Sequence, residues 1–269
     1  MPTIIDYVIY YLRSLLPSFI LASLVVLIGL LVYYFGKKTN LTLMDESIKH
    51  FERESSDWVT KIDLVEKSTV GRTYLVEVED DYFLSNFRLH FTMVHRHLIL
   101  SRIGSILRNR RDYVLLEADP KIEFVKRYQL EILQQKDTKR IKALSGMLLN
   151  LHTLELKNPS FDKHYKTWAN APRLFFGLLK EKKNIVKNLY TYRDYIVRVS
   201  IYPLSSPSIR LVAELNSKLN FKHLSQIISD ITTGIITLGK KGIYAKERES
   251  LRVSRDKDVE KDKGKRYSF

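Results

Sequence analysis

The sequence of 269 residues contains no cysteine. Disulfides, zinc sites built on thiolates and cysteine nucleophiles are therefore excluded. Glycine is scarce, at 10 residues without a glycine-rich run, so phosphate-binding loops and dinucleotide-binding turns are missing too. Neither the HExxH pattern of zinc proteases nor the GxSxG pattern of serine hydrolases occurs. These absences argue against an enzyme, and no motif calls for a cofactor.

Charge is absent from residues 14–36, which are almost entirely apolar. As a helix this run would be about 34 Å long, enough for a hydrocarbon core of about 30 Å. A cleaved signal peptide is the alternative, but its shorter apolar core precedes small residues, whereas this run ends in aromatic residues and lysines. We therefore predict a membrane-spanning helix. Its anchor residues are Leu15, Phe19, Leu24, Leu27, Leu31, Tyr33, Tyr34, Phe35, Lys37 and Lys38.

Basic residues flank the predicted span unequally. Arg13 alone precedes it, while Lys37, Lys38, Lys49 and Arg53 follow it. Because lysine and arginine favour the cytoplasmic side, we expect a single-pass protein with its N-terminus outside and its C-terminal part in the cytoplasm.

The chain divides into five segments by composition. Residues 1–13 are an interfacial lead-in continuous with the span at 14–36, and 37–58 form an amphipathic linker helix. Residues 59–240 are rich enough in apolar positions for a folded domain, and 241–269 are a charged tail, helical or disordered.

The predicted domain mixes strands with helices. Apolar residues alternate with polar ones in several runs, which predicts strands, and recur at helical spacing in others. The expected strands are 74–78, 87–93, 113–116, 122–133, 194–202 and 209–215, the last two as a hairpin, and the expected helices are 97–108, 137–151, 172–190 and 221–238. The fold class is therefore an α+β cytoplasmic domain anchored by one N-terminal transmembrane helix.

The net charge is +15 and the pI about 9.7, which predicts attraction to polyanions. RNA phosphates and an anionic membrane surface both fit, and the sequence does not separate them. An equally open alternative is a solvated basic surface whose arginines pair with acids elsewhere. Three basic clusters carry the candidates: Arg88, Arg96, Arg102, Arg108, Arg110 and Arg111; Lys180, Lys182, Lys183 and Lys187; and, in the tail, Lys240, Lys241, Lys246, Arg248 and Arg252.

Three histidines within the first cluster raise the question of a metal site. His90, His95 and His97 are divided between a predicted strand and a helix start, with no carboxylate nearby. This arrangement argues against a metal centre.

Two stretches carry a resemblance to a known family. The membrane exit YFGKK is followed by MDESIKHFERESSDW, and the strand-helix-strand unit reads FRLHFTMVHRHLILSRIGSILRNRRDYVLLEADP. With the hairpin and helix from Tyr195 to Leu238 and the basic tail, the chain resembles the calumin family, the single-span subunit of the PAT intramembrane-chaperone complex at the Sec translocon.

The resemblance implies an accessory factor that assists insertion and folding of multi-span membrane proteins. The implied partners are the Sec translocon, the ribosome through rRNA phosphates, a small partner membrane protein and nascent multi-span proteins, in the cell membrane if the protein is archaeal or the endoplasmic reticulum if it is eukaryotic. Calumin has a long acidic luminal segment and a long C-terminal coiled coil, and this sequence departs from it in both, so a calcium-binding role is not implied. The rival hypothesis is a membrane-tethered basic module that binds anionic lipid or nucleic acid without a role in insertion.

Overall fold

The computed structural model describes residues 4–79, 84–107, 110–121, 128–136, 151–202 and 206–240. The helices are α1 (Ile4–Ser55), α2 (Ile99–Leu107), α5 (Pro159–Asp162), α6 (Pro172–Glu181), α7 (Lys183–Thr191) and α8 (Phe221–Lys240). The strands are β1 (Val59–Lys67), β2 (Gly71–Val78), β3 (Leu84–Thr92), β4 (Tyr113–Pro120), β5 (Leu130–Gln134), β6 (His152–Leu154), β7 (Tyr165–Ala169), β8 (Ile196–Ile201) and β9 (Ile209–Glu214). The expected mixture of helices and strands is confirmed.

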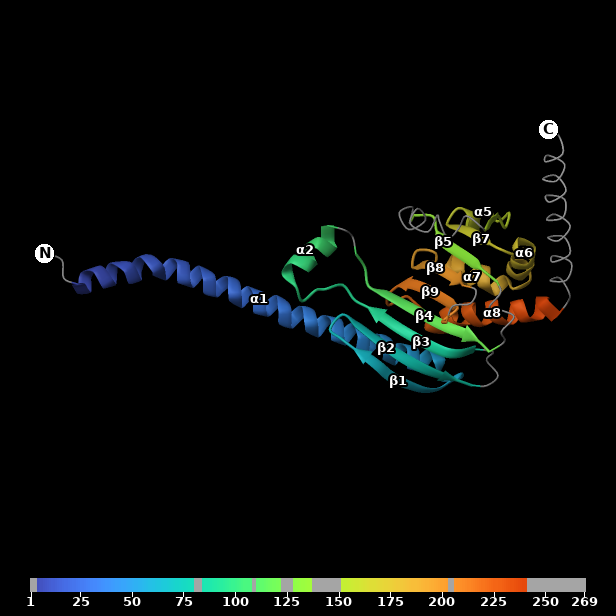
Figure 1. The fold of residues 1–269 in the computed structure, drawn as a ribbon, viewed down its shortest axis with the longest axis horizontal. Coiled ribbons are helices and arrows are strands. Elements are labelled where there is room, and N and C mark those ends of the chain that lie inside the picture. The colour runs from blue at the N-terminus through green and yellow to red at the C-terminus, as the bar shows by residue number, and fades with distance from the viewer. Residues whose placement is uncertain are drawn as a thin grey trace, which may run out of the picture.

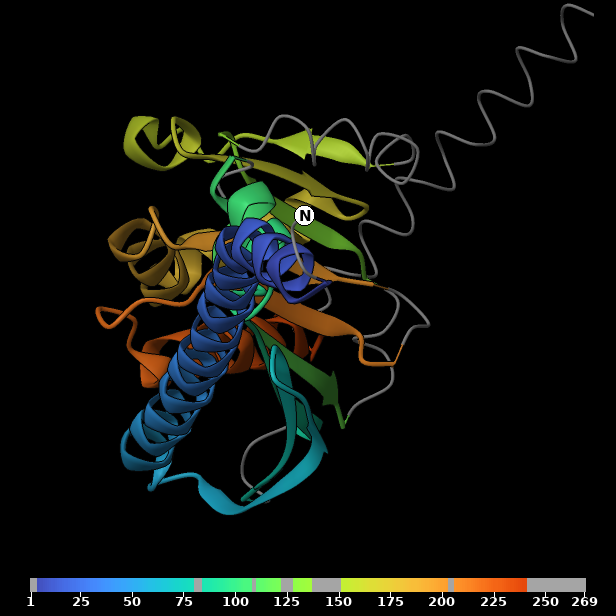
Figure 2. The ribbon, with the colours of Figure 1, turned by 90° about the vertical axis from the view of Figure 1, so that its left-hand side faces the viewer.

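The strands form one sheet of nine in the order β1-β2-β3-β4-β9-β8-β5-β7-β6, with antiparallel neighbours throughout. The predicted hairpin of β8 and β9 is present, with Val199 opposite Leu211. The hairpin lies between β4 and β5, which follow one another along the chain but do not pair with each other, so it forms the middle of the sheet. Figure 2 views this sheet from the N-terminal side of α1.

Helix α1 extends for 52 residues without a break, so the lead-in, the span and the linker helix expected from the sequence follow one another in a single helix. The helix runs through both Pro17 and Gly36, although each is unfavourable inside a helix. Among the described helices α1 alone is long and apolar enough to cross a membrane, and none of its most apolar window is buried. Figure 1 shows the N-terminal, apolar half of α1 projecting from the domain. The predicted anchor residues from Leu15 to Phe35 lie here, 44–72% exposed.

The C-terminal end of α1 belongs to the domain core. Phe51 is fully buried, with its ring edge-on to Trp58 and Phe221 and stacked on Phe87 at a centroid distance of 6.4 Å. These contacts join α1 to the start of β1, to β3 and to α8. Burial of a phenylalanine side chain stabilises a fold by about 1.5–3 kcal/mol, so these contacts hold the C-terminal end of α1 in the domain core.

One helix prediction is corrected in the middle of the chain. The expected helix 172–190 is two helices, α6 and α7, separated at Lys182, whose backbone has φ −91° and ψ 69°. No glycine or proline marks the break. Instead, Leu178 of α6 lies against Gly234 of α8, and Ile185 of α7 is fully buried, so the change of direction lets both helices pack on the core.

The sequence patterns missed β1, β6 and β7 as separate strands. The expected strand 122–133 corresponds to β5, which begins only at Leu130, and residues 122–127 lie outside the described residues. The expected helix from Asp137 also lies outside them, apart from Leu151.

Candidate polyanion-binding site

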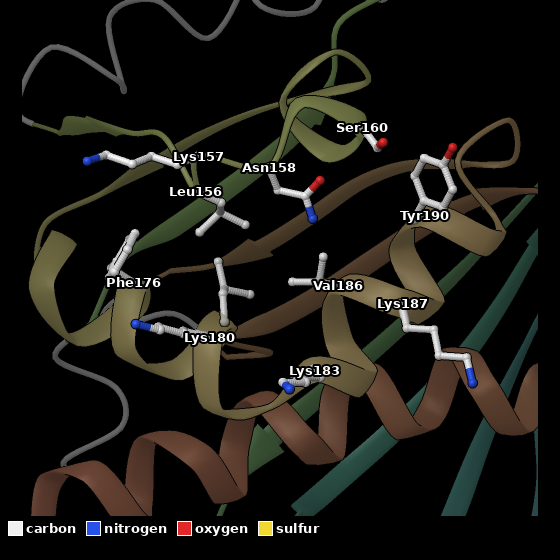
Figure 3. Close-up of a pocket in the computed structure, with 11 residues that line it drawn as sticks. Leu156, Lys157, Asn158, Ser160, Phe176, Lys180, Lys183, Val186, Lys187 and Tyr190 are labelled. Carbon is white, nitrogen blue, oxygen red and sulfur yellow. The ribbon is translucent and has the colours of Figure 1, made fainter.

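A groove of about 710 Å³ opens between α6, α7 and the segment that leads into α5. Figure 3 shows its lining: an apolar floor with lysine side chains at its edges. The floor is made by Leu156, Phe176, Leu179 and Val186, and the lysines are Lys157, Lys180, Lys183 and Lys187, with Asn158, Ser160 and Tyr190 completing the lining. We call this feature the lysine groove.

Two helices bring three lysines of the second cluster together. Pro172 lies in the first turn of α6, where its missing N–H costs nothing. Lys180 is in the last turn of α6, and Lys183 and Lys187 follow on α7, so all three reach one groove despite the break between the helices.

Lys182 takes a different direction from its neighbours. Its Cγ lies 3.6 Å from the position that a Cβ on Gly234 would occupy, so the side chain lies along α8. Burial raises the pKa of Asp230 on the same helix, and the nearby Lys182 charge opposes that rise. Lys182 therefore contributes to helix packing rather than to the lysine groove.

The fourth lysine of the groove, Lys157, comes from a turn held by side chains. Asp162 accepts hydrogen bonds from the backbone N–H groups of Leu156 (3.3 Å) and Asn158 (3.0 Å). Asn158 in turn accepts one from the N–H of Phe161, capping α5. Lys157 itself has φ 56°, in the left-handed region. Its sequence position, far from the second cluster, gave no signal of this role.

The four lysines make no ion pair with any residue that the structure describes. Like charges held around one groove repel one another, so an anion between them is stabilised. Lysine binds phosphate as a point charge on a flexible stem, without the fixed fork of arginine. The groove can therefore attract an anionic group, chiefly through charge and without strict geometry.

The first cluster is divided by the fold. Arg96 makes a two-pronged bond to Asp112, with N···O distances of 2.9 and 2.5 Å, and Arg111 pairs with Glu214. Arg88 lies opposite Glu117 in the sheet register. Arg96 and Arg111 are thus paired with acids from outside the cluster, one of the two possibilities that the sequence left open, whereas Arg88 is exposed and only its charge acts on Glu117.

The acids of the sheet show how these pairs work. Glu117 contacts His90 (2.9 Å) and Arg210 (2.9 Å). Its burial would raise the pKa, but the bond to His90 and the charges of Arg210 and Arg88 outweigh that effect, so the pKa of Glu117 is lowered. Glu131 is almost fully buried, and burial raises its pKa to about 7 even though Arg198 binds it at 3.0 and 3.1 Å.

Two other arginines of the first cluster are exposed. Arg102 and Arg110 line a pocket of about 380 Å³ with Val94, Ile106 and Arg96. Arg108 lies outside the described residues, as do Lys241, Lys246, Arg248 and Arg252, and α8 ends at Lys240. The tail cluster is thus without structural placement.

The histidines have separate surroundings. His90 lies between Glu117 and Thr73, and the rings of His95 and His97 are 5.7 Å apart. Across the described part of the chain, no group of three histidine, cysteine or acidic side chains is arranged to hold a metal ion.

Fold and site together define an α+β domain with a lysine groove, continuous with a helix long enough and apolar enough to cross a membrane. No protein-family model matches the chain, and no curated protein matches it.

Proposed function

We propose that the protein is a membrane-anchored, non-enzymatic accessory factor that works beside the Sec translocon and the ribosome and assists insertion of multi-span membrane proteins. In this proposal α1 crosses the membrane with its N-terminus outside, and the domain lies in the cytoplasm. The excess of basic residues after the span supports this orientation. The exposed apolar side chains of α1 leave it free to pack beside a translocon subunit, a small membrane protein or a nascent helix.

The observation that carries the proposal is the position of the lysine groove. Figure 1 shows α6 and α7 at the end of the domain away from the projecting half of α1. In this proposal the C-terminal end of α1, which is buried in the core, sets the distance between these lysines and the membrane. Lysines at that distance would meet rRNA phosphates of a ribosome bound at the translocon. Such contacts position a protein without reading sequence.

Co-sedimentation of the full-length protein in detergent with ribosome–translocon complexes, across a series of salt concentrations, tests the proposal. We expect binding that weakens steeply with salt, as phosphate contacts do. Replacing Lys180, Lys183 and Lys187 together with Glu should abolish it.

The matched control places the same charge change elsewhere. Lys67, Lys166 and Lys218 are exposed, lie outside the groove and are distant in sequence from the span, so their joint replacement with Glu should leave most of the binding. Equal loss in both variants would show an effect of net charge alone, and no binding at low salt would refute a ribosomal role.

The second candidate function is a membrane-tethered module that binds anionic lipid or nucleic acid without a role in insertion. The exposed Arg102 and Arg110 beside Ile106 favour it, because such a site suits a phosphate next to apolar groups. Binding to anionic vesicles or to RNA, without co-sedimentation with ribosomes, would support this candidate against the first.

A further inference from the structure

Helix α2 turns its apolar side away from the domain, opposite to the usual orientation of a helix on a domain surface. Its apolar residues lie on one side, and that side faces outward: Leu100 is 85% exposed, Leu107 81% and Ile106 71%. The opposite side carries serines, of which Ser105 is buried against the domain at 6% exposure. Amphipathic helices of water-soluble domains turn the apolar side inward. The reversed orientation indicates an apolar surrounding for the outer side of α2.

The start of α2 is held at the end of the apolar half of α1. Gly36 lets the backbone of Arg96 and His97 approach so closely that a Cβ on residue 36 would lie 2.4 Å from the Arg96 carbonyl oxygen. The ring of His97 meets Tyr33 edge-on at a centroid distance of 5.8 Å. Tyr33 belongs to the aromatic run that ends the apolar stretch, so α2 begins at the level where that stretch ends.

Hydrogen bonds fix the same segment at the next turn of α1. Asn40 is fully buried and donates to the carbonyls of Val94 (2.9 Å) and Thr69 (3.1 Å). Its own carbonyl oxygen accepts a bond from Arg96 (2.9 Å), the residue that also binds Asp112. The segment that leads into α2 is thus held against α1 at three residues, Tyr33, Gly36 and Asn40. Figure 1 accordingly shows α2 as the part of the domain nearest the projecting half of α1.

The charged residues beside α2 complete the pattern. Arg102 and Arg110 are exposed at the edge of its apolar side and share a pocket with Ile106. Arginine next to exposed isoleucine and leucine is the arrangement of helices that lie in the headgroup region, where the apolar side enters the acyl chains and cations meet phosphates.

We propose that α2 lies flat in the interface of the phospholipid leaflet at which α1 leaves the membrane. Leu100, Ile103, Ile106 and Leu107 enter the acyl region, and Arg102 and Arg110 contact lipid phosphates. The proposal rests on the anchoring role of α1 in the proposed function. A second membrane contact beside the span stops the domain from rotating about α1 and sets the direction in which the lysine groove faces.

The absence of cysteine allows a direct test. Full-length protein carrying a single cysteine, labelled with an environment-sensitive fluorophore, is reconstituted into vesicles of phosphatidylcholine and phosphatidylglycerol in equal parts, with no other protein present. The test positions are Leu100→Cys, Ile106→Cys and Leu107→Cys. Leu24→Cys in the span is the lipid reference, and Lys166→Cys on β7 is the aqueous reference.

We expect labels at the three test positions to be quenched by spin-labelled lipid at least about twofold more than the label at 166, and to be shielded from iodide. If the three labels are as accessible to iodide as the label at position 166 while the label at position 24 is in lipid, the proposal for α2 is wrong and α1 remains the anchor. The apolar outer side of α2 would then be a contact surface for another protein. If position 24 is also open to iodide, the anchoring role fails and the proposal for α2 fails with it.

Discussion

Replacement of Gly36 by alanine tests how the domain is fixed to α1. A Cβ at this position would lie 2.4, 2.5 and 2.6 Å from backbone atoms of Arg96 and His97. These are main-chain atoms, so no flexible side chain can move aside. To restore a normal contact, the segment before α2 must move away from α1 by about 1 Å, because non-bonded carbon atoms rest about 3.5 Å apart.

The cost follows from the hydrogen bonds that cross this contact. Asn40 bonds the Val94 carbonyl, and the Arg96 guanidinium bonds Asn40, both at 2.9 Å. A neutral bond contributes about 1 kcal/mol and a charged one about 2 kcal/mol, so their loss costs about 3 kcal/mol. Alanine returns about 1 kcal/mol because it favours helix over glycine. The net destabilisation of the domain is about 2 kcal/mol, a fall in melting temperature of about 4–8 °C for a domain of this size.

Thermal unfolding of the full-length protein in detergent, followed by near-UV circular dichroism, measures the shift. The same chain offers matched controls, because a Cβ on Gly29 or on Gly104 would meet nothing within 4 Å. Gly29→Ala and Gly104→Ala should leave the melting temperature unchanged or raise it slightly. If Gly36→Ala behaves like these two variants, the close approach of α1 to the segment before α2 is not what holds them together.

Three other predictions concern the core, the buried charge and the groove. Phe51→Ala should lower the free energy of unfolding by about 3–5 kcal/mol in urea titrations, because it removes the ring that joins α1 to the sheet and α8. Because the pKa of Glu131 is raised from 4.5 to about 7, the folded protein keeps a proton that the unfolded chain loses between these pH values, and the free energy of unfolding should fall by about 3 kcal/mol as the pH rises from 4.5 to 7. Glu131→Gln should remove this part of the pH dependence of stability. An unchanged pH profile in Glu131→Gln would contradict the prediction. Replacing Lys180, Lys183 and Lys187 with Gln should reduce the slope of log affinity for ribosomes against log salt by about 2–3, and an unaltered slope would show that these lysines do not meet phosphates.

Features set by local pattern were accessible from the sequence. The alternation in 194–202 and 209–215 predicted β8 and β9 as a hairpin, and the spacing of apolar residues in 221–238 predicted α8, because each element buries one face against the core. The uncharged run 14–36 predicted the exposed half of α1 for a similar reason: its length and composition are properties of the segment itself.

Features set by distant partners were not accessible. Insertion of the hairpin between β4 and β5 depends on pairings between residues far apart, such as Leu116 with Leu211. The break at Lys182 follows from the surface of α8 that α6 and α7 share, with no glycine or proline to announce it. Lys157 joins the lysine groove only because the turn before α5 is folded beside α7.

The basic clusters show why charge density along a chain is a poor guide to free charge in space. The stretch from Arg88 to Arg111 has no acid of its own, yet the fold supplies Asp112, from the turn before β4, to Arg96 and Glu214, from β9, to Arg111. Three lysines of the second cluster, Lys180, Lys183 and Lys187, receive no such partner among the described residues. An anionic ligand gains more from an unpaired cation than from one whose field is already offset by a neighbouring carboxylate. The shorter and less conspicuous cluster is therefore the stronger candidate for polyanion binding. Arg102 and Arg110, which are exposed and make no ion pair with a described residue, lie at the opposite end of the domain, beside the apolar side of α2.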